Sequence, residues 1–185
     1  QLGVRLRGNF DVRAVALPII ETLRDRLGET VSLTVRERNQ VVYIEKATPN
    51  RMIRVQQLVG ARAPLHVTAV GKLMLGAAGE EGIRAYAQRT NLPACTRNTI
   101  GDLPRLVAEC TDALDDEEAE IDVGCIGVLS HDATGNVIGG LSVSAPIERR
   151  RLAWVPEVLA AGAEISAELG CRLPAACDVR RRFGR

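Results

Sequence analysis

The chain has 185 residues, of which 46% are hydrophobic and 25% are charged, and its formal net charge is +1. This length and composition predict one soluble globular domain, and the near-zero charge excludes a protein that holds nucleic acid through an overall basic excess. Aromatic residues make up only 3% of the chain, which excludes an aromatic platform for stacking bases.

The cysteines and histidines do not have the sequence spacing of a metal-binding site. The five cysteines are odd in number and scattered, at Cys95, Cys110, Cys125, Cys171 and Cys177. No Cys-x-x-Cys pair occurs, and the two histidines are far apart in sequence. We therefore expect reduced thiols, no metal, no cofactor and a cytoplasmic location. The sequence has no long apolar run and no signal-peptide pattern, so we expect no membrane partner.

The first part of the chain predicts a linker followed by a helix. Residues 1–10 have no clear period and are predicted to be a linker remnant, whereas Asp11 suits the N-cap of a helix over residues 11–27. Gly28 stands where a glycine commonly ends a helix, and Pro18 predicts a kink or a late start. One helical face is apolar, with Val12, Val15, Ile19, Ile20, Leu23 and Leu27.

After this helix, apolar and polar residues alternate with a period of two, which is typical of half-buried strands. It predicts strands over residues 31–35 and 41–46, joined as a hairpin by a polar stretch. After a loop at residues 48–50, a third strand is predicted over residues 52–57.

The rest of the chain predicts helices around a second pair of strands. Helices are expected from Thr68, over residues 80–89, over residues 103–114 and, after the strands, over residues 148–169. Residues 123–132 and 137–145 predict a hairpin, and Gly170 ends the last helix before a basic tail over residues 171–185. The basic residues of that tail are Arg180, Arg181, Arg182 and Arg185. Because the hairpins are short and local, this order predicts an α+β domain over residues 11–170 with a largely antiparallel sheet.

Four segments resemble the effector-binding domain of IclR-family transcription regulators. They are residues 28–46 (GETVSLTV and VVYIEK), 62–72 (RAPLHVTAVGK), 95–100 (CTRNTI) and 115–146 (DDEEAEIDVGCIG and GNVIGGLSVSAP). The stretch before the last segment is several residues shorter than in the family. The resemblance implies a GAF-like fold, with a curved, largely antiparallel sheet flanked by helices.

The resemblance also implies a function. The family's domain binds a small effector molecule, associates with copies of itself as a dimer or tetramer, and is preceded by a winged helix-turn-helix domain. We therefore expect a ligand-sensing domain whose partners are a small-molecule effector and further copies of the chain. DNA would be contacted only through the N-terminal domain that this sequence lacks.

The segment RAPLHVTAVGK predicts an anion site at a helix start. If Thr68 caps the helix, the amides of Ala69, Val70 and Gly71 lie in the first turn without intrahelical acceptors, and the helix dipole favours a carboxylate there. An ordinary capped helix that faces water is the alternative. The resemblance favours a ligand site because this turn contacts the effector in the family, and His66 is expected to be structural.

Ser142 and Ser144 predict two hydroxyl groups on one face of a strand, with Gly140 leaving room beside them. A sheet face in contact with solvent would show the same pattern. The resemblance favours a ligand site, since the family holds the effector with this Ser-x-Ser pair. It also implies that Cys125 lines the pocket and that Asp115 reaches the ligand.

The third predicted strand would supply an apolar wall. Met52 and Val55 match wall positions of the family, and methionine adapts well to ligand shape. Of the acidic run over residues 115–118, the three residues after Asp115 are expected at a solvated surface. The predicted site as a whole suits a small organic acid, from a glyoxylate-like metabolite to an aromatic carboxylate.

Two other functions stay open on the sequence. A small enzyme could use Cys125 or a serine as nucleophile with His66 or His131 as base, although the sequence contains no Gly-x-Ser-x-Gly, metal-binding or phosphate-loop motif, so we expect no catalytic residue. An oligomerisation module with a vestigial pocket would have the same fold. A closed cavity lined by Ser142, Ser144 and Cys125 would distinguish a sensor from such a module.

Overall fold

The computed structural model of the chain contains one six-stranded antiparallel sheet in the order β3-β2-β1-β6-β5-β4. It describes the backbone of residues 2–172 and the side chains of residues 12–172. The strands are β1 (Thr30–Glu37), β2 (Gln40–Ala47), β3 (Arg62–Pro64), β4 (Leu114–Asp116), β5 (Val123–His131) and β6 (Val137–Pro146). The predicted α+β class and both predicted hairpins, β1–β2 and β5–β6, are confirmed.

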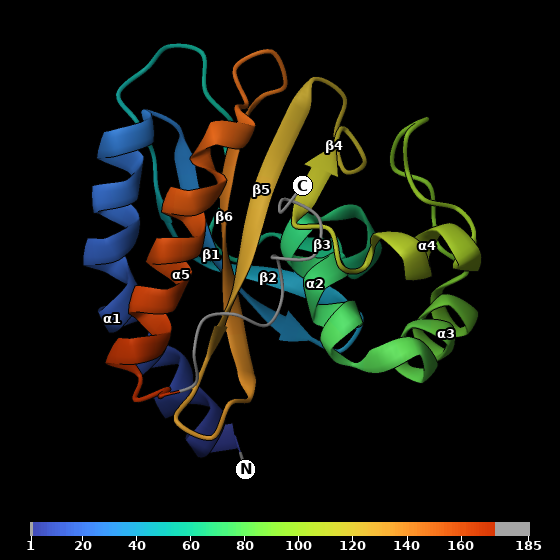
Figure 1. Cartoon of the computed structure of the whole chain (residues 1–185), viewed down its shortest axis with the longest axis horizontal. Helices are drawn as coiled ribbons and strands as arrows, with labels where there is room; N and C mark the ends of the chain where they lie inside the picture. The colour runs from blue at the N-terminus through green and yellow to red at the C-terminus, as the bar shows by residue number, and fades with distance from the viewer. Residues whose placement is uncertain (1, 173–185) are drawn as a thin grey trace.

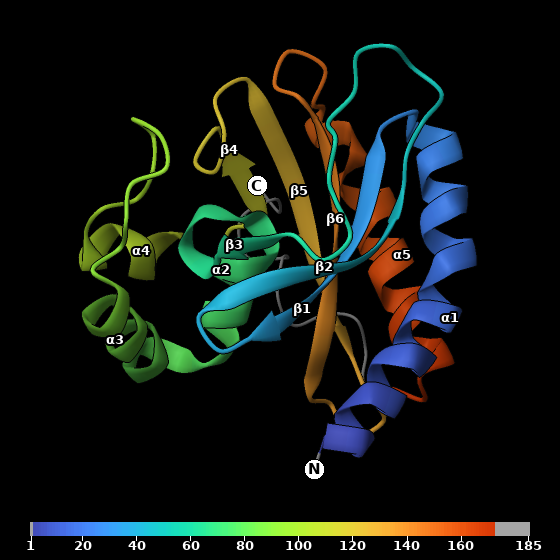
Figure 2. The same ribbon diagram turned by 180° about the vertical axis from the view of Figure 1, so that it is seen from behind.

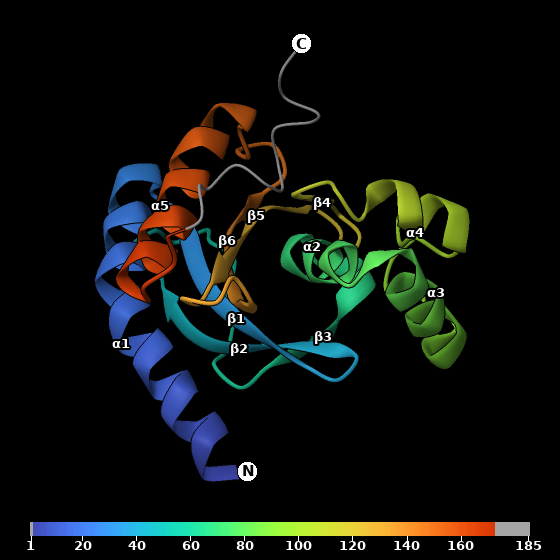
Figure 3. The same ribbon diagram turned by 60° about the horizontal axis from the view of Figure 1, so that its bottom comes forward.

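Helices cover both faces of the sheet (Figures 1 and 2). The long helices α1 (Leu2–Leu27) and α5 (Val155–Glu168) lie side by side on one face. The other face curls around α2 (Ala69–Ala77), with α3 (Gly79–Thr90) and α4 (Leu103–Glu109) outside it (Figure 3). The short 3₁₀ turns η1 (Leu65–Val67) and η2 (Leu152–Trp154) precede α2 and α5. Within residues 2–172, no helix is both long and apolar enough to span a membrane.

The convex face of the sheet is apolar, because alternate residues of the central strands point toward α1 and α5. Apolar residues of both helices are buried against these strands. The core consists of Val12, Ala16, Ile19, Ile20 and Leu23 from α1, Val31 and Leu33 from β1, Ala47 from β2, Ile126 and Val128 from β5, Leu141 and Val143 from β6, and Val155, Val158, Ala161 and Ile165 from α5.

The concave face carries a row of small polar residues instead. The row consists of Thr30, Ser32 and Thr34 on β1, and of Ser144, Ser142 and Gly140, which lie opposite them on β6. All of these hydroxyl side chains are buried. Because they alternate with the apolar core residues of the same strands, a polar layer lies directly beneath α2.

Three helix boundaries differ from the sequence prediction. α1 continues through residues 2–10, so Asp11 lies inside it and cannot be its N-cap, although Gly28 follows its end with φ = 68° as predicted. α4 ends early because the chain turns after it and has entered β4 by Leu114. α5 begins only at Val155, after η2, with a proline in its first turn.

The predicted third strand over residues 52–57 is wrong. This stretch is a loop between β2 and β3, and side chains from distant segments replace a neighbouring strand as donors to its carbonyl groups. These bonds join Thr30 Oγ1 to Val55 O at 2.7 Å, Lys46 Nζ to Gln57 O at 2.6 Å, and an Arg149 guanidinium nitrogen to Ile53 O at 3.0 Å. The strand that follows β2 is β3, which pairs with the start of β2.

The division into a linker over residues 1–10, a domain over residues 11–170 and a tail stays a prediction. The basic cluster of the tail and Cys177 lie outside the described residues. Cys95, Cys110, Cys125 and Cys171 are free cysteines.

Candidate functional site

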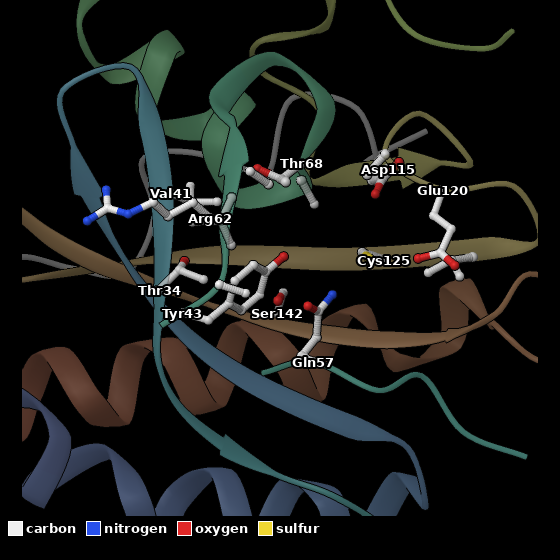
Figure 4. Close-up of a pocket in the computed structure, with 16 residues that line it drawn as sticks. Thr34, Val41, Tyr43, Gln57, Arg62, Thr68, Asp115, Glu120, Cys125 and Ser142 are labelled. Atoms are coloured by element: carbon white, nitrogen blue, oxygen red, sulfur yellow. The ribbon is translucent and has the colours of Figure 1, made fainter. Parts of the chain in front are cut away.

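A cavity of about 180 Å³ lies between the concave face of the sheet and the start of α2 (Figure 4). Its walls come from all six strands, from the start of α2, from the loop before β3, and from the segment that joins β4 to β5. Six of the predicted site residues line it, namely Thr68, Ala69, Val70, Asp115, Cys125 and Ser142. The fold therefore brings together residues that are far apart in the sequence.

The start of α2 has the predicted cap. Thr68 is extended, with φ −119° and ψ 144°, and its Oγ1 accepts a hydrogen bond from the Gly71 amide at 3.1 Å. This bond occupies the Gly71 amide. Of the three predicted donors, the amides of Ala69 and Val70 therefore stay available to a ligand, because no carbonyl of the helix can accept a hydrogen bond in its first turn. Gly71 itself allows close packing, because a Cβ there would collide with the Leu65 carbonyl.

Two glycines of the sheet let the start of α2 approach closely. A Cβ at Gly127 of β5 would lie 3.0 Å from the Val70 nitrogen, and a Cβ at Gly140 of β6 would collide with the Val70 side chain. Ser142 pairs with Gly127 across β5 and β6. The end of the helix that carries the free amides therefore lies directly above the hydroxyl row of the sheet.

The two predicted serines have different positions. Ser142 lines the cavity, is 6% exposed, and has no hydrogen-bond partner among residues 12–172. Ser144 is buried behind it and does not line the cavity; its Oγ lies 3.2 Å from Cys125 Sγ. Ser144 thus orients Cys125, which does face the cavity.

Asp115 and Cys125 pair across β4 and β5 and form an acidic part of the wall. Asp115 is 2% exposed, and its Oδ1 accepts a hydrogen bond from the Glu118 amide at 2.9 Å. Burial raises the pKa of Asp115 to about 6. Burial, and next to it the charge of Asp115, also raises the pKa of the Cys125 thiol, so this cysteine stays protonated and is a poor nucleophile.

Glu118 is also buried, which corrects the prediction that the three residues after Asp115 are solvated. Its Oε1 lies 2.8 Å from Lys72 Nζ, which is equally buried and lies 3.6 Å from Glu109. Burial raises the pKa of Glu118 to about 7, although Lys72 acts in the opposite direction. This network joins the segment that follows β4 to α2 and α4, and so links the part of the chain that carries Asp115 to the helix that carries the first-turn amides.

A family model for the C-terminal domain of the bacterial transcriptional regulator IclR matches residues 5–167. The chain belongs to the IclR family. Its curled antiparallel sheet with flanking helices is the GAF-like effector-binding domain of these regulators.

Relatives of this IclR domain include repressors and solved structures. The HTH-type transcriptional repressor AllR of Escherichia coli strain K12 is 32% identical over 154 residues, which are 80% of this chain and 57% of the repressor. The chain thus spans less than two thirds of that relative's length. The crystal structure of Thermotoga maritima IclR has a TM-score of 0.78 at 27% identity, covering 91% of this chain and 74% of that one. An IclR homologue from Microbacterium hydrocarbonoxydans, complexed with 4-hydroxybenzoate, has a TM-score of 0.79 at 25% identity. The match covers 87% of this chain and 69% of that one.

Met52 and Val55 do not line the cavity of the IclR domain. Met52 is 99% exposed, and Val55 is buried in the loop that contacts β1. They lie in a loop instead of the predicted strand, so they do not supply the wall of this cavity. The apolar wall is supplied by Val41, Ala61, Ala63 and Val123.

Several lining residues were missed by sequence reasoning. Thr34 and Tyr43 reach the cavity from neighbouring strands, and Gln57, Arg62 and Glu120 lie around it (Figure 4). Thr34 could have been found, because it continues the alternation of hydroxyl residues in β1 on the face that pairs with Ser142. The other four give no comparable signal, since local patterns do not show which face or loop meets the cavity.

The histidines give no support to the enzyme alternative. His66 is buried, with Nδ1 2.8 Å from the Tyr86 hydroxyl and Nε2 3.2 Å from the Pro93 carbonyl, so both ring nitrogens have structural partners. Burial also lowers the pKa of His66. His131 ends β5, roughly 20 Å along the strand from Cys125 at about 3.3 Å per residue. Within residues 12–172, no group of His, Cys, Asp and Glu side chains could hold a metal ion.

Proposed function

We propose that this domain senses a small organic acid on behalf of an IclR-type transcription regulator. The observation that carries the proposal is that the first-turn amides of α2 share one cavity with the Ser142 hydroxyl. Unpaired amides and the helix dipole favour an anion at Ala69 and Val70. Ser142, which has no partner in residues 12–172, adds a neutral donor on the opposite wall.

The cavity volume limits the size of the acid. About 180 Å³ is only slightly more than the roughly 150 Å³ of an engineered protein cavity that holds benzene. The site therefore suits compact acids, from glyoxylate-like metabolites to carboxylates with a single aromatic ring. The 4-hydroxybenzoate complex of the Microbacterium homologue supports an aromatic acid of that size.

The action of the whole regulator is proposed from its relatives. AllR is an HTH-type repressor and is longer than this chain, so DNA would be contacted by a helix-turn-helix domain outside this sequence. Copies of the chain would associate as dimers or tetramers in the cytoplasm. The effector would shift the balance between subunit arrangements, because a ligand acts only through its different affinities for the states.

The proposal is tested by melting the chain with a panel of acids that includes glyoxylate, pyruvate, benzoate and 4-hydroxybenzoate. At a concentration a hundredfold above its Kd, a binding acid stabilises the native state by about 2.7 kcal/mol, which raises the melting temperature by about 5–10 °C. Ser142→Ala should reduce the shift. Ser130→Ala is the matched control, because Ser130 is a buried serine of the neighbouring strand that does not line the cavity.

An unchanged melting temperature with every acid would contradict the proposal. It would favour an oligomerisation module with a vestigial pocket.

A further inference from the structure

We infer that Tyr43 is a ligand-binding residue of this cavity, whose hydroxyl donates a hydrogen bond to the bound acid and selects for ligands with an acceptor oxygen. The inference rests on the proposed function. It concerns a residue that none of the sequence motifs singled out, and it depends on how β2 is paired, on the partners of its hydroxyl, and on its protonation.

A bulge in β2 turns Tyr43 toward the cavity. Leu33 of β1 pairs with Glu45, but the next residue, Thr34, pairs with Tyr43, so Ile44 is the extra residue. Without the bulge, Thr34 would pair with Ile44, and Tyr43 would lie on the convex face. The convex side is where Glu45 forms an ion pair with Arg13 of α1 at 2.9 Å. The bulge therefore moves Tyr43 to the concave face, where it lines the cavity.

The Tyr43 hydroxyl has no partner within the part of the chain that the structure describes. The side chain is 8% exposed and makes no hydrogen bond among residues 12–172, and its hydroxyl end reaches into the cavity that Ser142 and Thr68 also line (Figure 4). Its oxygen is not among the fully enclosed polar atoms without a partner in residues 12–172, so the hydroxyl meets the open space of the cavity. Phenylalanine would keep the ring packing, and no group of residues 12–172 bonds to this hydroxyl, so stability does not explain it.

The other tyrosine of the chain shows what a structural hydroxyl looks like. Tyr86 is fully buried on α3, and its hydroxyl lies 2.8 Å from His66 Nδ1 and accepts a hydrogen bond from the His66 amide at 3.3 Å. The chain contains only these two tyrosines. The Tyr86 hydroxyl has hydrogen-bond partners within the protein, whereas the Tyr43 hydroxyl faces the cavity.

The protonation of Tyr43 fixes its role as a donor. Burial, followed by the nearby Cys125 and Asp115, raises the pKa of Tyr43, so the phenol stays neutral. A carboxylate has two oxygens and about four acceptor positions, more than the amides of Ala69 and Val70 can fill. The hydroxyls of Tyr43 and Ser142 supply the additional donors from the sheet side of the cavity.

The test compares Tyr43→Phe with Tyr86→Phe, using 4-hydroxybenzoate and glyoxylate as probes in calorimetric titrations and melting experiments. Tyr43→Phe should weaken binding roughly ten- to hundredfold, the equivalent of one hydrogen bond to a charged group, and leave the melting temperature without ligand unchanged or slightly raised. Tyr86→Phe should lower that melting temperature and leave the affinity of the remaining folded protein unchanged.

The outcomes separate the two proposals. If the wild-type chain binds a probe and Tyr43→Phe binds it equally well, the inference about Tyr43 is wrong and the proposed function stands. If Tyr43→Phe instead lowers the melting temperature without ligand as Tyr86→Phe does, the hydroxyl is structural and the inference is also wrong. If the wild-type chain binds neither probe, the proposed function fails for these acids and the inference fails with it.

Discussion

Asp115 is the cavity residue whose charge depends most on pH near neutrality. Its pKa rises from 3.8 to about 6, and that of its neighbour Glu118 rises from 4.5 to about 7, chiefly because both carboxyl groups are buried. A raised pKa means that the folded chain binds protons that the unfolded chain has already released. The contribution of these two carboxyl groups to the free energy of unfolding is therefore complete below about pH 4. It is lost as the pH rises through the folded-state pKa values of about 6 and 7.

Asp115→Asn should remove part of this pH dependence. The amide keeps an oxygen for the Glu118 amide but carries no buried charge, so the variant should be more stable than the wild type at pH 8, and the difference should shrink toward pH 5. Urea unfolding at several pH values measures this. Glu81→Gln is the control, because Glu81 is an exposed carboxylate of α3 that lies outside the cavity, and the variant should keep the wild-type slope between pH 5 and 8. An Asp115→Asn variant with the wild-type profile would contradict the account.

At the scale of elements, the sequence predicts best what local residues determine. The cap at Thr68, the stop at Gly28 and the two hairpins follow from short patterns, and all are present. The loop over residues 52–57 was mistaken for a strand because its partners are side chains that are distant in sequence. The bulge that turns Tyr43 inward depends on pairing with β1, which the local alternation of residues does not show.

The close approach of α2 to the sheet gives a prediction at this scale. In Gly140→Ala the new Cβ would collide with Val70 Cγ1 and lie 2.9 Å from the Val128 carbonyl oxygen, so the start of α2 must move away from β6. We expect a loss of about 1–3 kcal/mol in the free energy of unfolding and weaker acid binding. Chemical unfolding and titration with 4-hydroxybenzoate measure both effects.

Gly101→Ala is the matched control, because nothing lies within 4 Å of a Cβ at that position. It should leave stability and binding nearly unchanged. Wild-type stability and affinity in Gly140→Ala would show that the α2 start does not need this close contact.

At the scale of the whole molecule, two apolar cores lie on opposite faces of one sheet. One core packs β1, β5 and β6 against α1 and α5, and the other surrounds α2, α3 and α4. The cavity lies on the concave side, where the hydroxyl row meets the start of α2. The family resemblance indicated which motifs belong to this site, but only the curled sheet shows which of their residues face the same cavity. Gly71, Ser144, Met52 and Val55 do not line it.

The most direct test of the central claim is an amide NMR titration of the chain with the same panel of acids. The account predicts saturable shifts that are largest at Ala69 and Val70 and that extend to Cys125 and Ser142 on the facing strands. Shifts confined to regions away from the cavity, such as α3, would contradict it. So would the absence of any shift at Ala69 and Val70 with every acid.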